Sequence, residues 1–169
     1  MPARVFDPDE TAGYYDDADV SAFYRQYWGG EDIHIGHYAT GEETVAEASA
    51  AMTRRLIDAA GIRAGQRVLD IACGYGGTLR TLARMGCHAA GIDISRACVG
   101  EARRANRAAG LAGRIEVAQG DFHAIDSADN RWDAVICQES LIHSPDRAAV
   151  FAEVFRVLRP GGVFAFSDI

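Results

Sequence analysis

Residues 68–77 read VLDIACGYGG, and this stretch decides the fold of the 169-residue chain. It is a short apolar strand that runs into a glycine-rich turn, where the backbone can come close to a ligand. Residues 91–95 read GIDIS, a second short strand that ends in an acid, Asp93. A strand, a glycine turn, a helix and a strand ending in Asp form a nucleoside-binding βαβ unit, in which the acid accepts hydrogen bonds from a ribose. The sequence therefore predicts a ligand that contains a nucleoside.

Strands and helices alternate outward from this unit. We expect strands at 68–71, 88–92, 114–117 and 132–137, a fifth beginning at Val163, and helices ending near 85, 110 and 158. Such alternation predicts an α/β fold with a Rossmann-like parallel sheet and helices on both faces. We assign this domain to residues 42–169. The chain stops at Ile169, inside the fifth expected strand, so we expect it to be the N-terminal part of a longer protein.

Residues 1–41 form a separate N-terminal segment in this interpretation. About the first dozen residues carry prolines and acids and are expected to be flexible. Aromatic residues recur at helical spacing over 20–28, which fits either a helix packed on the domain or a lid over a ligand. The following residues, WGGEDIHIGHY, are expected to form a loop, and 42–60 a helix.

Composition restricts the classes of partner and compartment. Hydrophobic residues make up 49% of the chain, as in globular proteins, and the formal net charge is −7. This charge argues against nucleic acid or an anionic membrane as the main partner. No signal peptide, membrane-length apolar run or CxxC pair is present, so we expect a reducing, cytoplasmic location. All 17 basic residues are arginine, which fits either a GC-rich genome or a salt-rich cytoplasm.

The glycine turn distinguishes two classes of nucleoside cofactor. Dinucleotide enzymes use GxGxxG, but counting from Gly74 places Leu79 at the third glycine position. Asp70, at the end of the first strand, would repel a pyrophosphate. The same carboxylate suits a ligand that carries an ammonium and a sulfonium, as S-adenosylmethionine does. The turn therefore favours S-adenosylmethionine over a dinucleotide.

Three motifs together carry a family resemblance. DIACGYGG resembles the first motif of class I S-adenosylmethionine-dependent methyltransferases, D/E-x-G-x-G-x-G, with Ala72 in place of the first glycine. GIDIS resembles their second motif and GDFHAI, at 120–125, their third, while LRPGGVFAFSD resembles the segment that leads into strand five. The resemblance implies that S-adenosylmethionine is bound by Asp70, Ala72, Gly74, Gly76, Asp93, Ile94, Asp121 and Phe122. Asp93 would hold the ribose, Asp121 the adenine amino group, and Ile94 and Phe122 the adenine ring.

Two further stretches narrow the resemblance. Residues 14–38 and QESLIHSPD, at 138–146, are similar to the sarcosine/dimethylglycine N-methyltransferases, which make glycine betaine, and more distantly to phosphoethanolamine N-methyltransferases. This resemblance implies that Tyr15 closes over the methyl donor and pairs with His143 as the catalytic residues. It also implies cofactor contacts from Tyr15, His34, Ile35 and Gln138. Substrate contacts are expected from Tyr24, Trp28, Glu139 and His143; close relatives have Asp at the position of Glu139.

The expected substrate explains these residue types. A small amine is mostly protonated near neutral pH, so His143 either accepts its proton or only positions the substrate. Aromatic faces stabilise the cationic amine. A substrate carboxylate would need a cation, either Arg25 or a residue beyond Ile169. Glu31, Asp32, His34 and His37 lack metal-ligand spacing, and we expect no metal.

Other functions remain open from the sequence. The acceptor can instead be a phosphobase or a carbon atom of a natural product, and the chain can also be a binding module without turnover. The sequence leaves the oligomeric state undetermined.

Overall fold

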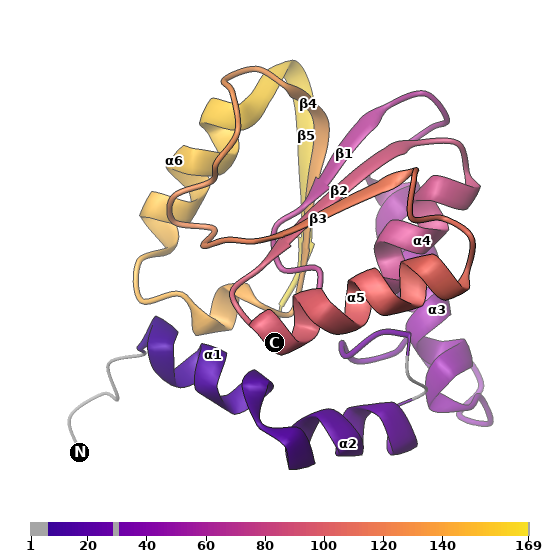
Figure 1. The fold of residues 1–169 in the computed structure, drawn as a ribbon. Coiled ribbons are helices and arrows are strands. Elements are labelled where there is room, and N and C mark those ends of the chain that lie inside the picture. Colours follow the sequence, from indigo (N-terminus) through magenta and orange to yellow (C-terminus); the bar gives the residue numbers. More distant parts are fainter. Residues whose placement is uncertain (1–6, 29–30, 169) are drawn as a thin grey trace.

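The computed structural model describes residues 7–28 and 31–168 (Figure 1). The flexibility expected of residues 1–6, the loop expected at 29–30 and the end of the fifth strand at 169 lie outside these residues.

Five parallel strands form one sheet in the order β3-β2-β1-β4-β5. The strands are β1 (Arg67–Asp70), β2 (His88–Asp93), β3 (Ile115–Gln119), β4 (Trp132–Gln138) and β5 (Leu158–Ser167). The predicted Rossmann-like sheet is confirmed. Its strand order reverses between β1 and β4, and ligands of such sheets bind at this switch point, beyond the carboxyl ends of the strands. Asp70, Asp93 and Gln138 are the last residues of β1, β2 and β4.

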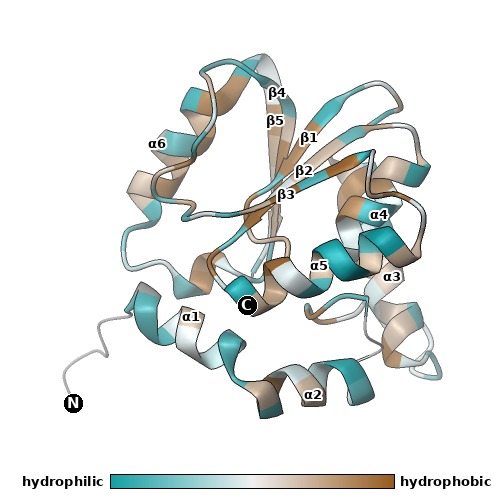
Figure 2. Cartoon of the chain, in the orientation of Figure 1, coloured by the Kyte–Doolittle hydropathy of each residue, from teal (hydrophilic) through white to brown (hydrophobic). Residues whose placement is uncertain are grey.

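Helices cover both faces of the sheet (Figure 1). One apolar core lies between the sheet and helices α3 (Val45–Ala59), α4 (Gly77–Arg84) and α5 (Arg96–Ala108). The second core lies under α6 (Arg147–Val157), which follows a short 3₁₀ helix, η1 (Leu141–His143). In Figure 2 the strands are mostly hydrophobic, whereas α5 presents a hydrophilic surface. This two-sided cover explains why the central strand β4 is a nearly continuous buried run.

The fifth strand begins earlier than expected. The RPGG residues were expected to be a turn before a strand starting at Val163, but β5 already begins at Leu158. Trp132 pairs with Leu158 and Ala134 with Val163, so the register shifts within this segment. Gly161, at φ +76°, supplies the backbone conformation for the irregularity.

The start of the described chain is helical rather than irregular. Helix α1 (Pro8–Asp16) begins at Asp7, whose side chain accepts a hydrogen bond from the Asp9 N–H at 2.9 Å. Asp17 caps α2 (Ala18–Tyr27) in the same way. The proline and acids that suggest a flexible segment act here as helix-start signals, because Asp is a strong N-cap and proline fits the first helical position.

Long-range contacts fasten the N-terminal segment to the domain. Asp16 at the end of α1 accepts hydrogen bonds from the Ser95 hydroxyl at 2.6 Å and the Ala97 N–H at 3.0 Å. Asp32 accepts from the Thr78 N–H at 3.1 Å, so it caps α4 from a distance. The buried guanidinium of Arg80 bonds Glu31. Residues on both sides of the pair 29–30 therefore hold the segment at the starts of α4 and α5.

Candidate active site

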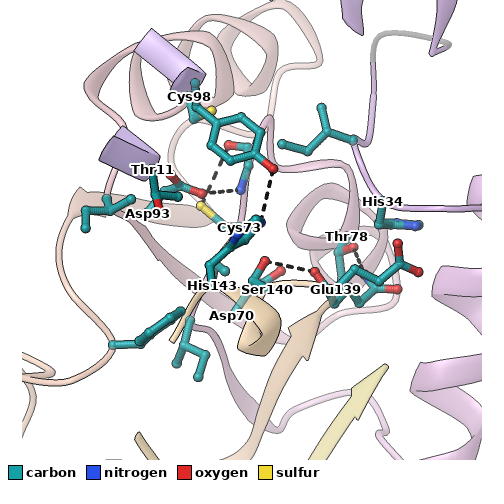
Figure 3. Close-up of a pocket in the computed structure, with 18 of the residues that line it drawn as sticks. Thr11, His34, Asp70, Cys73, Thr78, Asp93, Cys98, Glu139, Ser140 and His143 are labelled. Carbon is teal, nitrogen blue, oxygen red and sulfur yellow. Dashed lines mark hydrogen bonds between the residues drawn. The ribbon is translucent and has the colours of Figure 1, made fainter. Parts of the chain in front are cut away.

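A cavity of about 350 Å³ lies at the carboxyl ends of β1, β2 and β4, where Figure 3 shows the labelled side chains gathered. Its volume is in the range of small-molecule sites. The cavity brings together residues from five separate stretches of sequence. Of the predicted site residues, it is lined by Tyr15, Tyr24, Trp28, His34, Ile35, Asp70, Ala72, Gly74, Asp93, Ile94, Asp121, Phe122, Gln138, Glu139 and His143.

Gly76 is the predicted site residue that lies outside this lining. It precedes α4 with φ +79°, and a Cβ added there would lie 3.2 Å from the Cβ of Ala102 on α5. Its role in the structure is therefore to turn the chain into α4 against α5. Gly74, two residues earlier, does line the cavity.

Asp93 joins the glycine turn to the start of α5. One of its carboxylate oxygens accepts from the Gly74 N–H at 2.8 Å, and the other from the Ser95 N–H at 2.9 Å. Burial raises the pKa of Asp93, and these two bonds partly oppose the increase. Each carboxylate oxygen can accept a second hydrogen bond. Asp93 is thus both a structural clamp and a fixed acceptor at the cavity wall.

Asp70 is a buried carboxyl with little local stabilisation. It is 2% exposed and accepts a hydrogen bond from the Ala72 N–H at 3.2 Å. Burial raises its pKa to about 7, and the charges of Asp93 and Asp32 add to the increase. A cationic ligand in the cavity would stabilise the ionised form.

Gln138 presents a buried acceptor without a partner. Its Nε2 donates to the Thr78 hydroxyl at 2.8 Å, whereas its Oε1 bonds no group among the described residues. An unsatisfied buried carbonyl is costly unless a ligand supplies a donor. The site therefore offers three acceptors, from Asp70, Asp93 and Gln138, to a ligand rich in N–H and O–H groups.

Tyr15 and His143 meet across the cavity, as the family resemblance implied. The Tyr15 hydroxyl lies 3.5 Å from His143 Nε2. Burial raises the pKa of Tyr15, and burial also lowers the pKa of His143, an effect that Asp168 partly opposes. Both shifts favour neutral groups, so the Tyr15 hydroxyl donates to Nε2 or accepts from it according to the imidazole tautomer.

The aromatic run of α2 splits between two faces. Tyr24 and Trp28 line the cavity, and the Trp28 indole donates to the His34 carbonyl at 2.9 Å. Phe23 and Tyr27 are exposed. Arg25 lies 4.0 Å from Glu101 on α5 and is not part of the cavity lining, so the structure does not bring it to the substrate position suggested for it.

Glu139 connects the end of β4 to the N-terminal segment. Its Oε2 accepts from the Ile35 N–H at 2.8 Å, and its backbone has φ +52°, which is unusual for a residue with a side chain. This conformation aims the Glu139 carboxylate at the loop after position 30. Ile35 therefore contributes its backbone to the rim of the site.

Sequence interpretation missed several polar residues here. Thr78 lines the cavity and accepts the Gln138 amide. His123 donates from Nδ1 to Asp121 Oδ1 at 2.7 Å, and its Nε2 lies 2.8 Å from Ser144 Oγ, so it connects the GDFHAI stretch to the loop of His143. The signal for His123 is its spacing two residues after Asp121; nothing in the sequence pairs Thr78 with Gln138.

Within 7–28 and 31–168, no three or more His, Cys, Asp or Glu side chains gather in a way that could hold a metal ion. In the same part of the chain, no helix has both the length and the apolar character needed to cross a bilayer.

Comparison with known proteins decides the family. A family model described as "Methyltransferase domain" matches residues 68–162. The chain belongs to the class I S-adenosylmethionine-dependent methyltransferases. S-adenosylmethionine is the cofactor of this family, and the cluster of buried acceptors fits its ammonium and its ribose hydroxyls.

Individual relatives of the chain have named methyl acceptors. The dimethylglycine N-methyltransferase of Parasynechococcus marenigrum is 45% identical over 161 residues, which cover 93% of this chain and 57% of that protein. A candidate sarcosine dimethylglycine methyltransferase from Galdieria sulphuraria has a crystal structure with TM-score 0.82 and 36% identity, covering 89% of this chain and 59% of that one. A sterol 24-C-methyltransferase of Eremothecium gossypii is 35% identical, with 96% and 43% coverage. The chain thus spans about half the length of such relatives.

Cofactor binding by this family member is expected to depend on the protonation of Asp70. The pKa of Asp70, about 7, falls when a cation binds, so binding releases a proton and affinity decreases as pH drops below about 7. Titration calorimetry of S-adenosylmethionine in two buffers of different ionisation enthalpy measures this release. Asp70→Asn should abolish it; release that persists in the variant would assign the proton to another group.

Proposed function

We propose that the protein transfers a methyl group from S-adenosylmethionine to the nitrogen of a small amine such as sarcosine or dimethylglycine, toward glycine betaine, an osmoprotectant. The observation that carries the proposal is the Tyr15–His143 pair in an acidic, aromatic cavity. The N-methyltransferase relatives support the same acceptor class. A reducing cytoplasm fits the four free, buried cysteines.

The donor end of the cavity is built from fixed acceptors. S-adenosylmethionine supplies, when bound, an electrophilic methyl group on a sulfonium. Asp93 would hold the ribose hydroxyls, and Phe122 and Ile94 would pack against the adenine. Asp70 and the Oε1 of Gln138 would take the ammonium of the methionine part, because both are buried acceptors in need of a donor or a cation.

The acceptor end must bind a cation and remove its proton. Among the described lining residues, Asp32 and Glu139 carry carboxyl groups that are not assigned to the donor, and no lining residue is an arginine or lysine, which favours an ammonium substrate. The rings of Tyr24 and Trp28, 5.7 Å apart, offer faces for cation–π contact. His143 Nε2, kept neutral by burial, either accepts the amine proton or orients the amine. In-line positioning of the nitrogen supplies much of the remaining catalysis.

A carbon acceptor is the second candidate, because sterol 24-C-methyltransferases are also similar to the chain. Activity with radiolabelled S-adenosylmethionine, measured on glycine, sarcosine, dimethylglycine, phosphoethanolamine and a sterol, separates the two. We expect turnover on sarcosine or dimethylglycine. Turnover on the sterol alone would replace the proposal, and binding of S-adenosylhomocysteine without turnover on any acceptor would favour a non-catalytic role.

A further inference from the structure

A continuous row of buried polar groups leads from the cavity to His34. The Gln138 amide bonds Thr78, the Thr78 hydroxyl lies 3.4 Å from the Thr53 hydroxyl, and the latter lies 3.1 Å from His34 Nε2. The other ring nitrogen, Nδ1, lies 3.0 Å from the Ile35 carbonyl. Figure 3 shows His34, Thr78 and the cavity side chains in one view. Thr53 and His34 are 1% and 7% exposed, so water does not compete strongly for these groups.

The Ile35 carbonyl determines which group donates in each hydrogen bond of this row. A carbonyl only accepts, so Nδ1 carries a proton, and in neutral His34 the Nε2 atom is therefore an acceptor. Thr53 must donate to that nitrogen and accept from Thr78. Thr78 in turn has used its hydrogen and must accept from Gln138. The Gln138 amide therefore donates from its NH₂ group to Thr78 and points its oxygen, Oε1, into the cavity.

We infer that Thr53 and His34 are positioning residues, which through Thr78 hold the Gln138 carbonyl oxygen toward an N–H group of a bound ligand. This inference rests on the proposed function, since it assumes a ligand with an ammonium or amine. Neither Thr53 nor the direction of the hydrogen bonds follows from the family motifs.

Protonation of His34 exchanges the donor and the acceptor in each hydrogen bond of the row. Its Nε2 then donates to Thr53, Thr53 donates to Thr78, and Thr78 donates to the amide oxygen, so the amide rotates and turns its NH₂ into the cavity. The charged groups facing His34 are Asp32, with Oδ1 3.7 Å from Nε2, Glu139 and Asp70. Burial lowers the pKa of His34, but the hydrogen bond and charge of Asp32 outweigh it and raise the pKa overall. The raised pKa lets the reversal begin at a higher pH than it would for an ordinary histidine.

Thr53→Val tests the row without touching the cavity, because Thr53 is not part of its lining. The Thr78 hydroxyl loses its acceptor and takes the amide oxygen instead, as in the protonated state. We expect the affinity for S-adenosylhomocysteine to fall about tenfold, the effect of losing one hydrogen bond to a charged group. The ratio of wild-type to variant affinity should approach one as pH falls, because protonated His34 reverses the hydrogen bonds in the wild type as well. The titration of Asp70 affects both proteins equally and cancels from this ratio.

Two probes identify the N–H group. If it is the ammonium of the donor, 5′-methylthioadenosine, which lacks that ammonium, should bind both proteins equally. If it belongs to the methyl acceptor, S-adenosylhomocysteine affinity stays unchanged and dimethylglycine binds the preformed complex less tightly. Unchanged affinity for every probe would overturn the inference. These are binding measurements, so they are independent of whether turnover occurs.

A double-mutant cycle excludes a merely structural role for Thr53. In a Gln138→Met background there is no amide for the row to orient, so Thr53→Val should have no further effect. Persistence of the tenfold loss there would refute the positioning role. Thr53→Ser keeps the hydroxyl and should restore wild-type affinity. Thr53→Cys, with its weak thiol donor, is the substitute if the valine variant does not fold.

Discussion

His143→Ala is expected to lower kcat by about 10²–10⁴-fold, the usual contribution of a positioned proton acceptor. The substitution leaves Asp70, Asp93 and the Gln138 oxygen in place, so binding of S-adenosylhomocysteine should change little. Turnover of dimethylglycine by the full chain, with calorimetry for binding, measures both quantities.

The pH profile of kcat/KM separates a base from a positioning group. Burial lowers the pKa of His143, so its neutral form persists below about 6.5, and the acidic limb of the wild-type profile should lie below that pH. If His143 is the base, the variant loses this limb. If His143 only positions the amine, kcat falls and the limb remains. Full turnover of His143→Ala at every pH would rule out both roles.

Tyr15→Phe has a matched control in Tyr27→Phe. Tyr15 is half-buried beside His143, whereas Tyr27 is 61% exposed and is not part of the cavity lining. Removing the Tyr15 hydroxyl should reduce kcat because Nε2 loses the hydrogen-bond partner that orients its ring. Tyr27→Phe should leave kcat unchanged.

The sequence predicts the strand ends of this site because the signals there are local. Short apolar runs end in glycine, Asp or Gln, and parallel strands bring such ends to one edge of a sheet. Asp70, Asp93 and Gln138 were therefore predictable as neighbours. The Tyr15–His143 pair is different: 128 residues separate the two, and only the family resemblance brought them together.

Other features depend on contacts that no local pattern reports. Thr53 and Thr78 lie on different helices and look like ordinary polar positions in the sequence. Gly76 fits the family motif, but a Cβ there would meet Ala102 on α5, and the residue is not part of the cavity lining. Helix α1 was predictable in principle from Asp7 and Pro8, but prolines and acids also occur in irregular segments, and the two readings differ only in the capping geometry.

Asp93→Ala is expected to weaken S-adenosylhomocysteine binding by about 100-fold or more, since charge-assisted hydrogen bonds contribute about 1.5–3 kcal/mol each and a ribose diol can make two. The variant also leaves the N–H groups of Gly74 and Ser95 without their acceptor. A thermal unfolding curve of the ligand-free variant, compared with that of the wild type, measures how much stability is lost with these two hydrogen bonds. Calorimetry of the folded variant, at a temperature below its transition, then measures the binding loss.

Asp121→Ala is the matched comparison for Asp93. The Asp121 side chain is 42% exposed, and its Oδ1 already accepts from the backbone N–H of His123 at 2.8 Å. Its contact to an adenine amino group is therefore made in competition with water and His123, and we expect a loss below about tenfold. Equal losses for the two variants would mean that Asp93 acts through the fold of the glycine turn rather than through the ribose. A larger loss for Asp93→Ala, together with an unchanged affinity for adenine alone, would assign the difference to the ribose hydroxyls.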